Sequence, residues 1–275
     1  MPSVRCSHAV IVKGGLGNQL FQLAFALYLK TKGIDIGYLV LDYDQDTYSR
    51  KPFLQYLEIP FLVTTRSEYA LKFGHTISEI SETVYNSVSF DKLHEYSISN
   101  SLLLNGYWQN VKYLNQSNIE SYLPHTSYAL SPLLALHVRR VDYAHHGLLP
   151  TKYYEEIIDL NPQKRFIVFS DEPNMTKHFF SKFETFLCVS SDLKEVFKLE
   201  RPLNPFEEFI LLSSHESMAI ANSTFSWIAA FIAHKRRYAK VFFPSHWSLL
   251  TDNPIIGNSE WNNWIKIKTN LVSFV

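Results

Sequence analysis

Hydrophobic and polar positions follow one another in blocks that predict alternating strands and helices. Residues 9–12 form an apolar run typical of a buried strand, and the glycine-rich residues 14–17 predict a turn. Residues 18–32 carry apolar side chains at helical spacing, and residues 36–41 predict a second strand that ends at Asp42. The chain is therefore expected to begin with a strand, loop, helix, strand unit.

The alternation becomes more regular after residue 132. Strands are expected over 133–138, 166–169, 186–189, 218–221 and 240–243, and helices over 151–160, 174–183, 205–213 and 224–234. This order is typical of parallel βαβ units with helices on both faces of the sheet. Residues 51–130 show one clear strand, 102–104, and no detailed topology is predicted there. We expect an α/β protein with two lobes, 1–130 and 131–275, and a cleft between them.

Composition excludes several classes of protein. The 275 residues are 46% hydrophobic and 15% aromatic, which indicates a globular enzyme or binder. Formal net charge is zero, so nucleic acid is not an expected partner. The two cysteines, Cys6 and Cys188, lack disulfide or zinc spacing and fit a reducing compartment. No stretch approaches the ~18 apolar residues that a membrane span needs, so a cytoplasmic protein is expected.

A basic cluster at 234–237 ends one of the predicted helices. Cations at a helix C-terminus complement the helix dipole, and this solvated helix end is the favoured interpretation. Contact with an anionic membrane surface is the alternative.

Charged residues follow directly after the apolar run 133–136, in the sequence 137–143, His-Val-Arg-Arg-Val-Asp-Tyr. Open α/β sheets bind ligands beyond the carboxyl ends of their strands. The guanidinium groups of Arg139 and Arg140 present forks of donors that suit the oxygens of a diphosphate. Salt-bridged, solvent-facing residues at a strand end are the alternative interpretation.

The turn at 14–19 opens a predicted helix, where backbone amides and the helix dipole favour an anion. Gly15 and Gly17, with Asp42 at the end of the next strand, partly match a dinucleotide fingerprint, but Leu20 stands where the third glycine belongs. A glycine-rich tight turn without a ligand is the alternative.

Two further strand ends carry polar groups. Residues 222–227, Asn-Ser-Thr-Phe-Ser-Trp, open a predicted helix and suit phosphate binding or simple helix capping. Residues 170–172, Ser-Asp-Glu, suit a base edge, a ribose hydroxyl or a solvated loop. His145 and His146 lack metal-ligand spacing, and no bound metal is predicted.

Taken in order, four motifs resemble the alpha-1,2-fucosyltransferase family, glycosyltransferase family 11, in its bacterial form. They are residues 14–22, 137–143, 169–171 and 222–227, and weaker similarity covers 146–150 and 106–109. The resemblance implies a GT-B-like fold of two Rossmann-like lobes, with the acceptor on 1–130 and GDP-fucose on 131–275. It implies inverting transfer of L-fucose from GDP-beta-L-fucose to a galactose 2-hydroxyl, with no cofactor and no essential divalent metal.

The resemblance also implies roles for individual residues. Arg139 holds the beta-phosphate, Arg140 supports it, and His137 faces ribose or guanine. Asp171 contacts the nucleoside. The remaining donor-binding residues implied are Gly15, Asn18, Gln19, Asn222, Ser223, Thr224 and Phe225.

Transfer to a hydroxyl also requires stabilisation of the leaving diphosphate and removal of a proton. Arg139 and helix-terminal amides are expected to stabilise the diphosphate. Asp142 is the first candidate for the base and His146 the second. An orienting role for Asp142 toward the arginines, or proton uptake by the leaving group, are the alternatives. Val141 departs from the glycine frequent at this point of the family motif.

The vertebrate family members carry a membrane anchor that this chain lacks, which makes it similar to bacterial enzymes of surface-glycan synthesis such as O-antigen. The expected partners are GDP-fucose and a galactose-terminated oligosaccharide. A lipid-linked acceptor is expected to bring the cytoplasmic protein into peripheral contact with the inner membrane face.

Two other functions compete. A nucleotide-binding oxidoreductase is suggested by Gly15, Gly17 and Asp42 but leaves the arginine motif unexplained. A non-catalytic glycan-binding protein is suggested by the aromatic content, including Trp108 and Trp247, whose rings can stack on sugars. A position in the core is the favoured interpretation of such residues.

Overall fold

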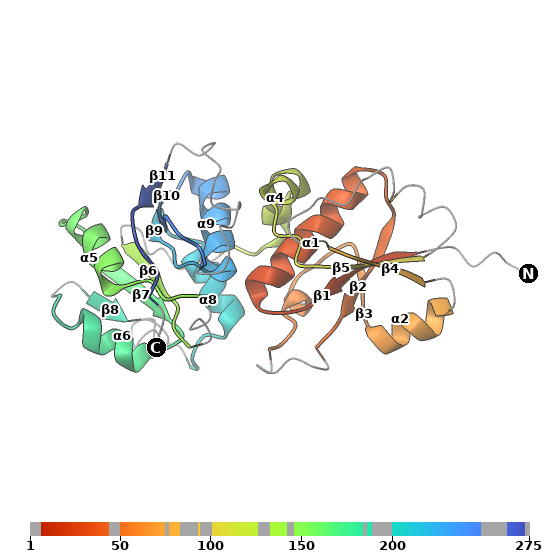
Figure 1. Ribbon diagram of the computed structural model, residues 1–275, viewed down its shortest axis with the longest axis horizontal. Helices are drawn as coiled ribbons and strands as arrows, with labels where there is room; N and C mark the ends of the chain where they lie inside the picture. Colours follow the sequence, from red (N-terminus) through yellow and green to blue (C-terminus); the bar gives the residue numbers. More distant parts are fainter. Residues whose placement is uncertain are drawn as a thin grey trace, which may run out of the picture. The chain divides into compact units, whose positions relative to one another are not determined.

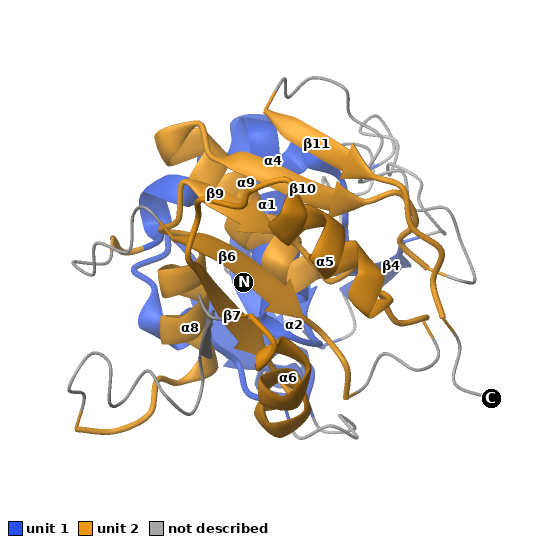
Figure 2. Ribbon diagram, turned by 90° about the vertical axis from the view of Figure 1, so that its left-hand side faces the viewer, with its two compact units in different colours: residues 1–123 blue, residues 124–275 orange. Residues whose placement is uncertain are grey.

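The computed structural model describes residues 7–43, 50–74, 77–82, 93, 101–125, 133–141, 146–183, 186–188, 200–248 and 263–272. The chain divides into two compact units, Met1–Leu123 and Pro124–Val275, coloured separately in Figure 2. The sequence placed this boundary near residue 130. Each unit is built on its own parallel sheet.

Unit 1 contains a five-stranded sheet in the order β3-β2-β1-β5-β4. Its strands are β1 (His8–Val12), β2 (Ile36–Leu41), β3 (Leu62–Thr65), β4 (Ile77–Ser81) and β5 (Ser101–Asn105). Its helices are α1 (Leu16–Thr31), α2 (Arg66–Phe73) and α4 (Val111–Ser117), with 3-10 turns η1 (Leu54–Tyr56) and η3 (Ile119–Tyr122). The chain runs outward from β1 through β2 to β3 and then returns to the other side of β1. The strand order therefore reverses between β1 and β5.

Helices cover both faces of this sheet. Figure 1 shows α1 and α4 together on one side and α2 on the other. Tyr69 and Phe73 of α2 pack on Tyr38 and Ile11. All five residues of β1 are buried, as expected for a central parallel strand with helices on both faces.

Unit 2 contains a six-stranded sheet in the order β11-β10-β9-β6-β7-β8. Its strands are β6 (Leu134–Val138), β7 (Phe166–Ser170), β8 (Phe186–Cys188), β9 (Ser217–Ala219), β10 (Lys240–Pro244) and β11 (Trp264–Ile267). Its helices are α5 (Thr151–Asp159), α6 (Pro173–Phe180), α8 (Pro205–Leu212) and α9 (Thr224–Arg237). Here the strand order reverses between β6 and β9.

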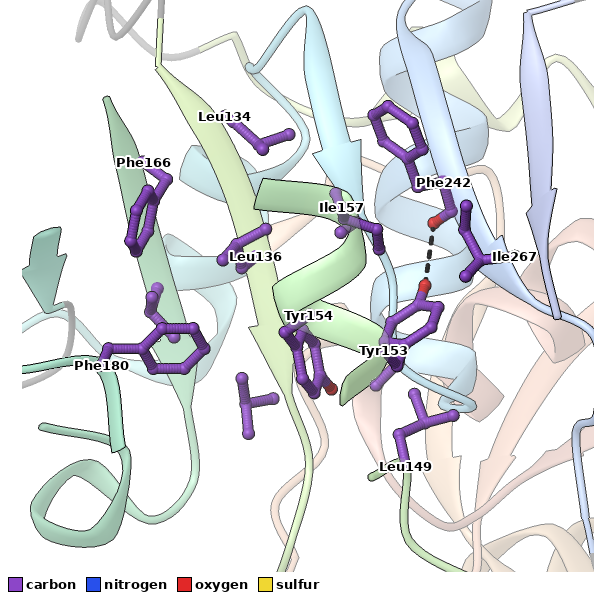
Figure 3. Packing of buried hydrophobic residues seen from close by; sticks show 14 residues of the cluster. Leu134, Leu136, Leu149, Tyr153, Tyr154, Ile157, Phe166, Phe180, Phe242 and Ile267 are labelled. Atoms are coloured by element: carbon purple, nitrogen blue, oxygen red, sulfur yellow. Dashed lines mark hydrogen bonds between the residues drawn. The ribbon is translucent and has the colours of Figure 1, made fainter. Parts of the chain in front are cut away.

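Alternate residues of these strands enter different cores. Leu134, Leu136 and Phe166 face the helices α5 and α6, as Figure 3 shows. The intervening residues face the opposite side of the sheet, where His137 stacks on Phe225 of α9. This alternation aims the His137 side chain toward the start of α9.

The predicted alternation after residue 132 is confirmed element by element, with boundaries shifted by a few residues. The strand expected at 102–104 is β5. The sequence analysis did not predict β3, α2, β4, α4 and β11. For β3 and β4, the reason is that these strands at the outer edges of the unit 1 sheet contain no fully buried residue and so show no apolar run. Among the described residues, no helix is long and apolar enough to cross a membrane.

The buried hydroxyl of Tyr153 links α5 to the sheet. It donates to the Ile220 carbonyl at 2.8 Å and lies 3.2 Å from the Phe242 carbonyl, the bond dashed in Figure 3. We expect Tyr153→Phe to lower the free energy of unfolding by about 1 to 2 kcal/mol, because buried carbonyl groups lose a donor. Urea denaturation measures this. Tyr238→Phe, at a ring that is 77% exposed, is the control and should change stability by less than about 0.5 kcal/mol.

Candidate functional site

The residues singled out in the second half of the chain meet at one edge of the unit 2 sheet. His137 is in β6, Arg139 and Arg140 follow that strand, Asp171 follows β7, and residues 222–225 connect β9 to α9. These strands are parallel neighbours, so their carboxyl ends share an edge. The edge includes the point between β6 and β9 where the strand order reverses, which is the usual ligand position in open α/β sheets.

The Asp171 carboxylate holds the loop after β6 in place. One oxygen accepts the backbone N–H of Arg140 at 2.9 Å, and the other accepts that of Val141 at 3.1 Å. The second oxygen also lies 3.2 Å from Arg139 Nε, in an ion pair whose side chains are only 28% and 17% exposed. The sequence interpretation gave Asp171 a nucleoside contact; the structure adds this positioning role, and the nucleoside contact stays a prediction.

His137 is a neutral imidazole beside the arginine. Burial, and secondarily the Arg139 charge, lower its pKa to about 3. Its ring stacks on Phe225 with centroids 5.4 Å apart. Nδ1 is buried and has no hydrogen-bond partner among the described residues. Since buried nitrogen atoms normally have partners, this atom is suited to a ligand polar group.

The start of α9 offers backbone donors at the same edge. Ser223 is the N-cap residue, yet its side chain makes no capping hydrogen bond to the amides of the first turn. Thr224 and Phe225 are the first helical residues and are partly exposed. Amides at a helix start bind anions when no side chain caps them.

The Asn222 side chain holds two loops together. Its side chain is buried, and Nδ2 donates to the carbonyl groups of Gly147 and Trp247, each at 2.9 Å. These bonds fix the two loops beside α9. A ligand contact through Nδ2 would require breaking them, and the predicted donor contact is untested.

The glycine-rich turn of unit 1 is held by amide side chains of α1. Gln19, fully buried, donates to the Gly14 and Lys51 carbonyls at 3.1 and 3.0 Å and accepts the Phe53 N–H at 2.8 Å. Asn18 Oδ1 accepts from Gln109 Nε2 at 2.9 Å. Gly15 precedes α1 and has open space around it. The donor contacts predicted for Gly15, Asn18 and Gln19 stay predictions, and Gln19 would have to give up bonds to make one.

Sequence reasoning assigned no role to two groups that organise this turn. Gln22 accepts the Lys13 N–H and donates to the Gly106 carbonyl, each at 3.0 Å, and so bridges the loops after β1 and β5. Glu82 Oε2 accepts the consecutive N–H groups of Tyr107 and Trp108 at 2.8 and 3.0 Å. For Gln22, the sequence offered one indication of a structural role, namely the repeated amide side chains within residues 18–22. For Glu82 the sequence offered no indication.

The described residues do not test the two proposed catalytic bases. Asp142 lies outside the described residues, as does His145. His146 is exposed, directly before the buried Gly147 and Leu148. The roles of Asp142 and His146 stay predictions.

Two features cited for the competing functions are engaged elsewhere. Asp42 Oδ2 pairs with Arg66 at 3.0 Å, where a dinucleotide site would have a ribose hydroxyl. Trp108 and Trp247 are 0% and 8% exposed, so neither presents a ring to a sugar. Both rings belong to the core, which was the favoured interpretation of these aromatic residues, and neither supports the glycan-binding alternative.

No protein-family model matches the chain. The O-antigen biosynthesis glycosyltransferase WbnK of Escherichia coli is 30% identical over 109 residues, which cover 36% of this chain. The matched segment spans only 33% of the length of WbnK.

Two solved structures resemble the chain over most of its length. The family 9 glycosyl transferase of Veillonella parvula is 8% identical, with a TM-score of 0.53, covering 98% of this chain and 88% of that one. The fucosyltransferase NodZ of Bradyrhizobium is 12% identical, with a TM-score of 0.48, covering 82% and 93%. The chain has the GT-B glycosyltransferase fold. The fold class expected from the sequence is confirmed.

Asp171→Asn tests the carboxylate that holds the loop after β6. An amide has one acceptor oxygen, and its NH2 group meets a backbone N–H or Arg139. We expect stability to fall by about 1 to 3 kcal/mol. Urea denaturation measures this. Glu172→Gln, the same charge change on an exposed neighbour, is the control; equal effects in the two variants would contradict the positioning role.

The buried His137 should make the protein sensitive to acid. The imidazole takes up a proton near pH 6.5 when unfolded but only near pH 3 when folded, so the unfolded state binds more protons between these values. Stability should therefore fall as pH drops from 6.5 toward 3. In His137→Gln this slope should be shallower by up to about 1.4 kcal/mol per pH unit. Denaturation midpoints across this pH range test the effect, and an unchanged dependence of stability on pH would refute it. Some dependence remains in the variant, because burial also lowers the pKa of His215, to about 4.

Proposed function

We propose that the chain is an inverting, metal-independent glycosyltransferase that moves L-fucose from GDP-beta-L-fucose to the 2-hydroxyl of a galactose residue. One arrangement carries the proposal: Arg139 is held by Asp171 and lies next to buried His137 at the switch point of the unit 2 sheet, where α9 begins. A guanidinium group, an unpartnered imidazole nitrogen and helix-start amides together suit a nucleoside diphosphate.

The chemistry follows from this arrangement. The bond between fucose C1 and the diphosphate oxygen breaks, the acceptor 2-hydroxyl oxygen forms a bond to C1 from the opposite face, and the hydroxyl proton passes to a base. Negative charge grows on the departing GDP, and Arg139 with the α9 amides stabilises it. Because Asp171 already orients Arg139, little reorganisation is needed in the transition state. Asp142 or His146 receives the proton in this scheme.

The sugar and acceptor are proposed on the motifs that resemble alpha-1,2-fucosyltransferases. WbnK, named as an O-antigen biosynthesis enzyme, supports a surface glycan as acceptor, although the similarity spans a third of that protein. A galactose-terminated, lipid-linked precursor would bring the enzyme to the cytoplasmic membrane surface.

Release of GDP from GDP-fucose, with and without lactose and in the presence of EDTA, tests the proposal. We expect acceptor-dependent release that EDTA does not abolish. Arg139→Ala should reduce the rate by ~10²- to 10³-fold, because one preorganised donor to the leaving group is lost. Arg139→Lys should restore only part of it, because the ammonium lacks the fork.

Arg165→Ala provides the matched control. Arg165 is exposed and precedes β7, so it lies at the opposite edge of the same sheet. Its loss should leave the rate unchanged. Tight GDP binding without fucose transfer to any galactoside, or an Arg139→Ala enzyme of full activity, would refute the proposal.

A further inference from the structure

Tyr107 presents an exposed aromatic ring at the switch point of unit 1. It follows β5, and its side chain is 43% exposed. A Cβ added to Gly14, in the turn after β1, would lie 3.3 Å from its ring. The ring therefore stands beside the point between β1 and β5 where the strand order reverses, the position at which this class of sheet binds ligands.

An unfavourable backbone conformation places this ring in solvent. Trp108 has φ 52°, a left-handed value that is rare for a large side chain. It buries the Trp108 ring completely, stacked on Phe25 at 4.1 Å, and leaves its neighbour Tyr107 outside. Such conformations persist only where surrounding contacts enforce them, and they concentrate at ligand sites.

The surrounding contacts that enforce this turn are specific. Glu82 accepts both the Tyr107 and Trp108 N–H groups. Gly106 has no space for a side chain, because a Cβ there would lie 2.4 Å from Glu82 Cβ. Gln22 binds the Gly106 carbonyl. Two hydrogen bonds to Glu82, one hydrogen bond from Gln22 and the missing side chain of Gly106 therefore fix this turn. The turn leaves one aromatic side chain exposed.

A cation lies beside the Tyr107 ring. Lys13 Nζ is 5.2 Å from the ring centroid and donates to Asn105 Oδ1 at 2.7 Å. Asn18 Nδ2 approaches the same Gly14 position as the ring, since a Cβ there would lie 2.9 Å from it, and Asn18 Oδ1 binds Gln109. An aromatic ring with an ammonium beside it and amides on the adjoining turns matches the chemistry of a pyranose, which has one face of C–H bonds and a rim of hydroxyl groups.

We propose that Tyr107 is the stacking platform of an acceptor subsite, which binds the C–H face of the terminal galactose ring. Lys13 and Gln109 hydrogen-bond the sugar hydroxyls, and Asn18 positions Gln109. This inference rests on the proposed function for the identity of the sugar. It assigns acceptor recognition to the turn formed by residues 106–109.

Saturation-transfer NMR with methyl beta-D-galactopyranoside, without donor, tests the subsite directly. We expect saturation of the protons on the C–H face of galactose in the wild-type protein. Tyr107→Leu retains apolar bulk against Gly14 but has no ring, so saturation should be lost. Tyr107→Phe retains the ring and should behave as wild type.

Kinetics give the second measurement. Tyr107→Leu should raise the KM for lactose about tenfold and leave the KM for GDP-fucose unchanged. Tyr238→Ala removes a more exposed ring after α9 in unit 2 and should change neither constant. An unchanged lactose KM in Tyr107→Leu, or a Tyr107→Phe variant as defective as Tyr107→Leu, would overturn the proposal.

Failure of the subsite and failure of the proposed function have different signatures. Saturation of galactose that depends on Tyr107, in a protein that transfers no fucose, would leave the subsite standing and remove the transferase. Fucose transfer that Tyr107→Leu does not affect would leave the transferase function standing and remove the subsite.

Discussion

The candidate donor site depends on two hydrogen bonds, which one carboxylate accepts from consecutive backbone amides. Asp171 binds the N–H groups of Arg140 and Val141 and pairs with Arg139, so one side chain sets both the path of the loop after β6 and the direction of its guanidinium. Loss of this carboxylate would remove the acceptors of the Arg140 and Val141 amides and one ion pair of Arg139. The stacking of His137 on Phe225 does not involve it.

Unit 1 contains the same interaction, a carboxylate that accepts two consecutive backbone N–H groups. Glu82 follows β4 and binds two consecutive amides after β5, as Asp171 follows β7 and binds two after β6. In each unit the bound loop follows a strand next to the reversal of strand order. In each unit a carboxylate therefore satisfies two backbone amides and also orients the turn that carries a proposed ligand-binding side chain, an arginine in unit 2 and a tyrosine in unit 1.

The sequence predicted what depends on local patterns and missed what depends on distant partners. Strands β6 to β10 of unit 2 and the arginine motif were readable, because buried parallel strands are continuous apolar runs. β3 was not, since Leu62 and Val63 at this sheet edge are exposed. Glu82 acts 25 residues away from Tyr107, and no spacing rule reveals that bond. The left-handed backbone of Trp108 has no signal in the sequence of a non-glycine residue, so the exposure of its neighbour Tyr107 was not predicted.

The neutrality of His137 determines how the candidate site would attract an anion. Asp171 largely balances Arg139, and the imidazole adds no charge at neutral pH, so the Arg140 guanidinium supplies the net charge of these four side chains. Attraction would then combine a single positive charge with the direction of fixed dipoles and donors. A site of this kind would recognise its ligand mainly by shape and hydrogen-bond geometry, with long-range Coulomb forces as the smaller contribution.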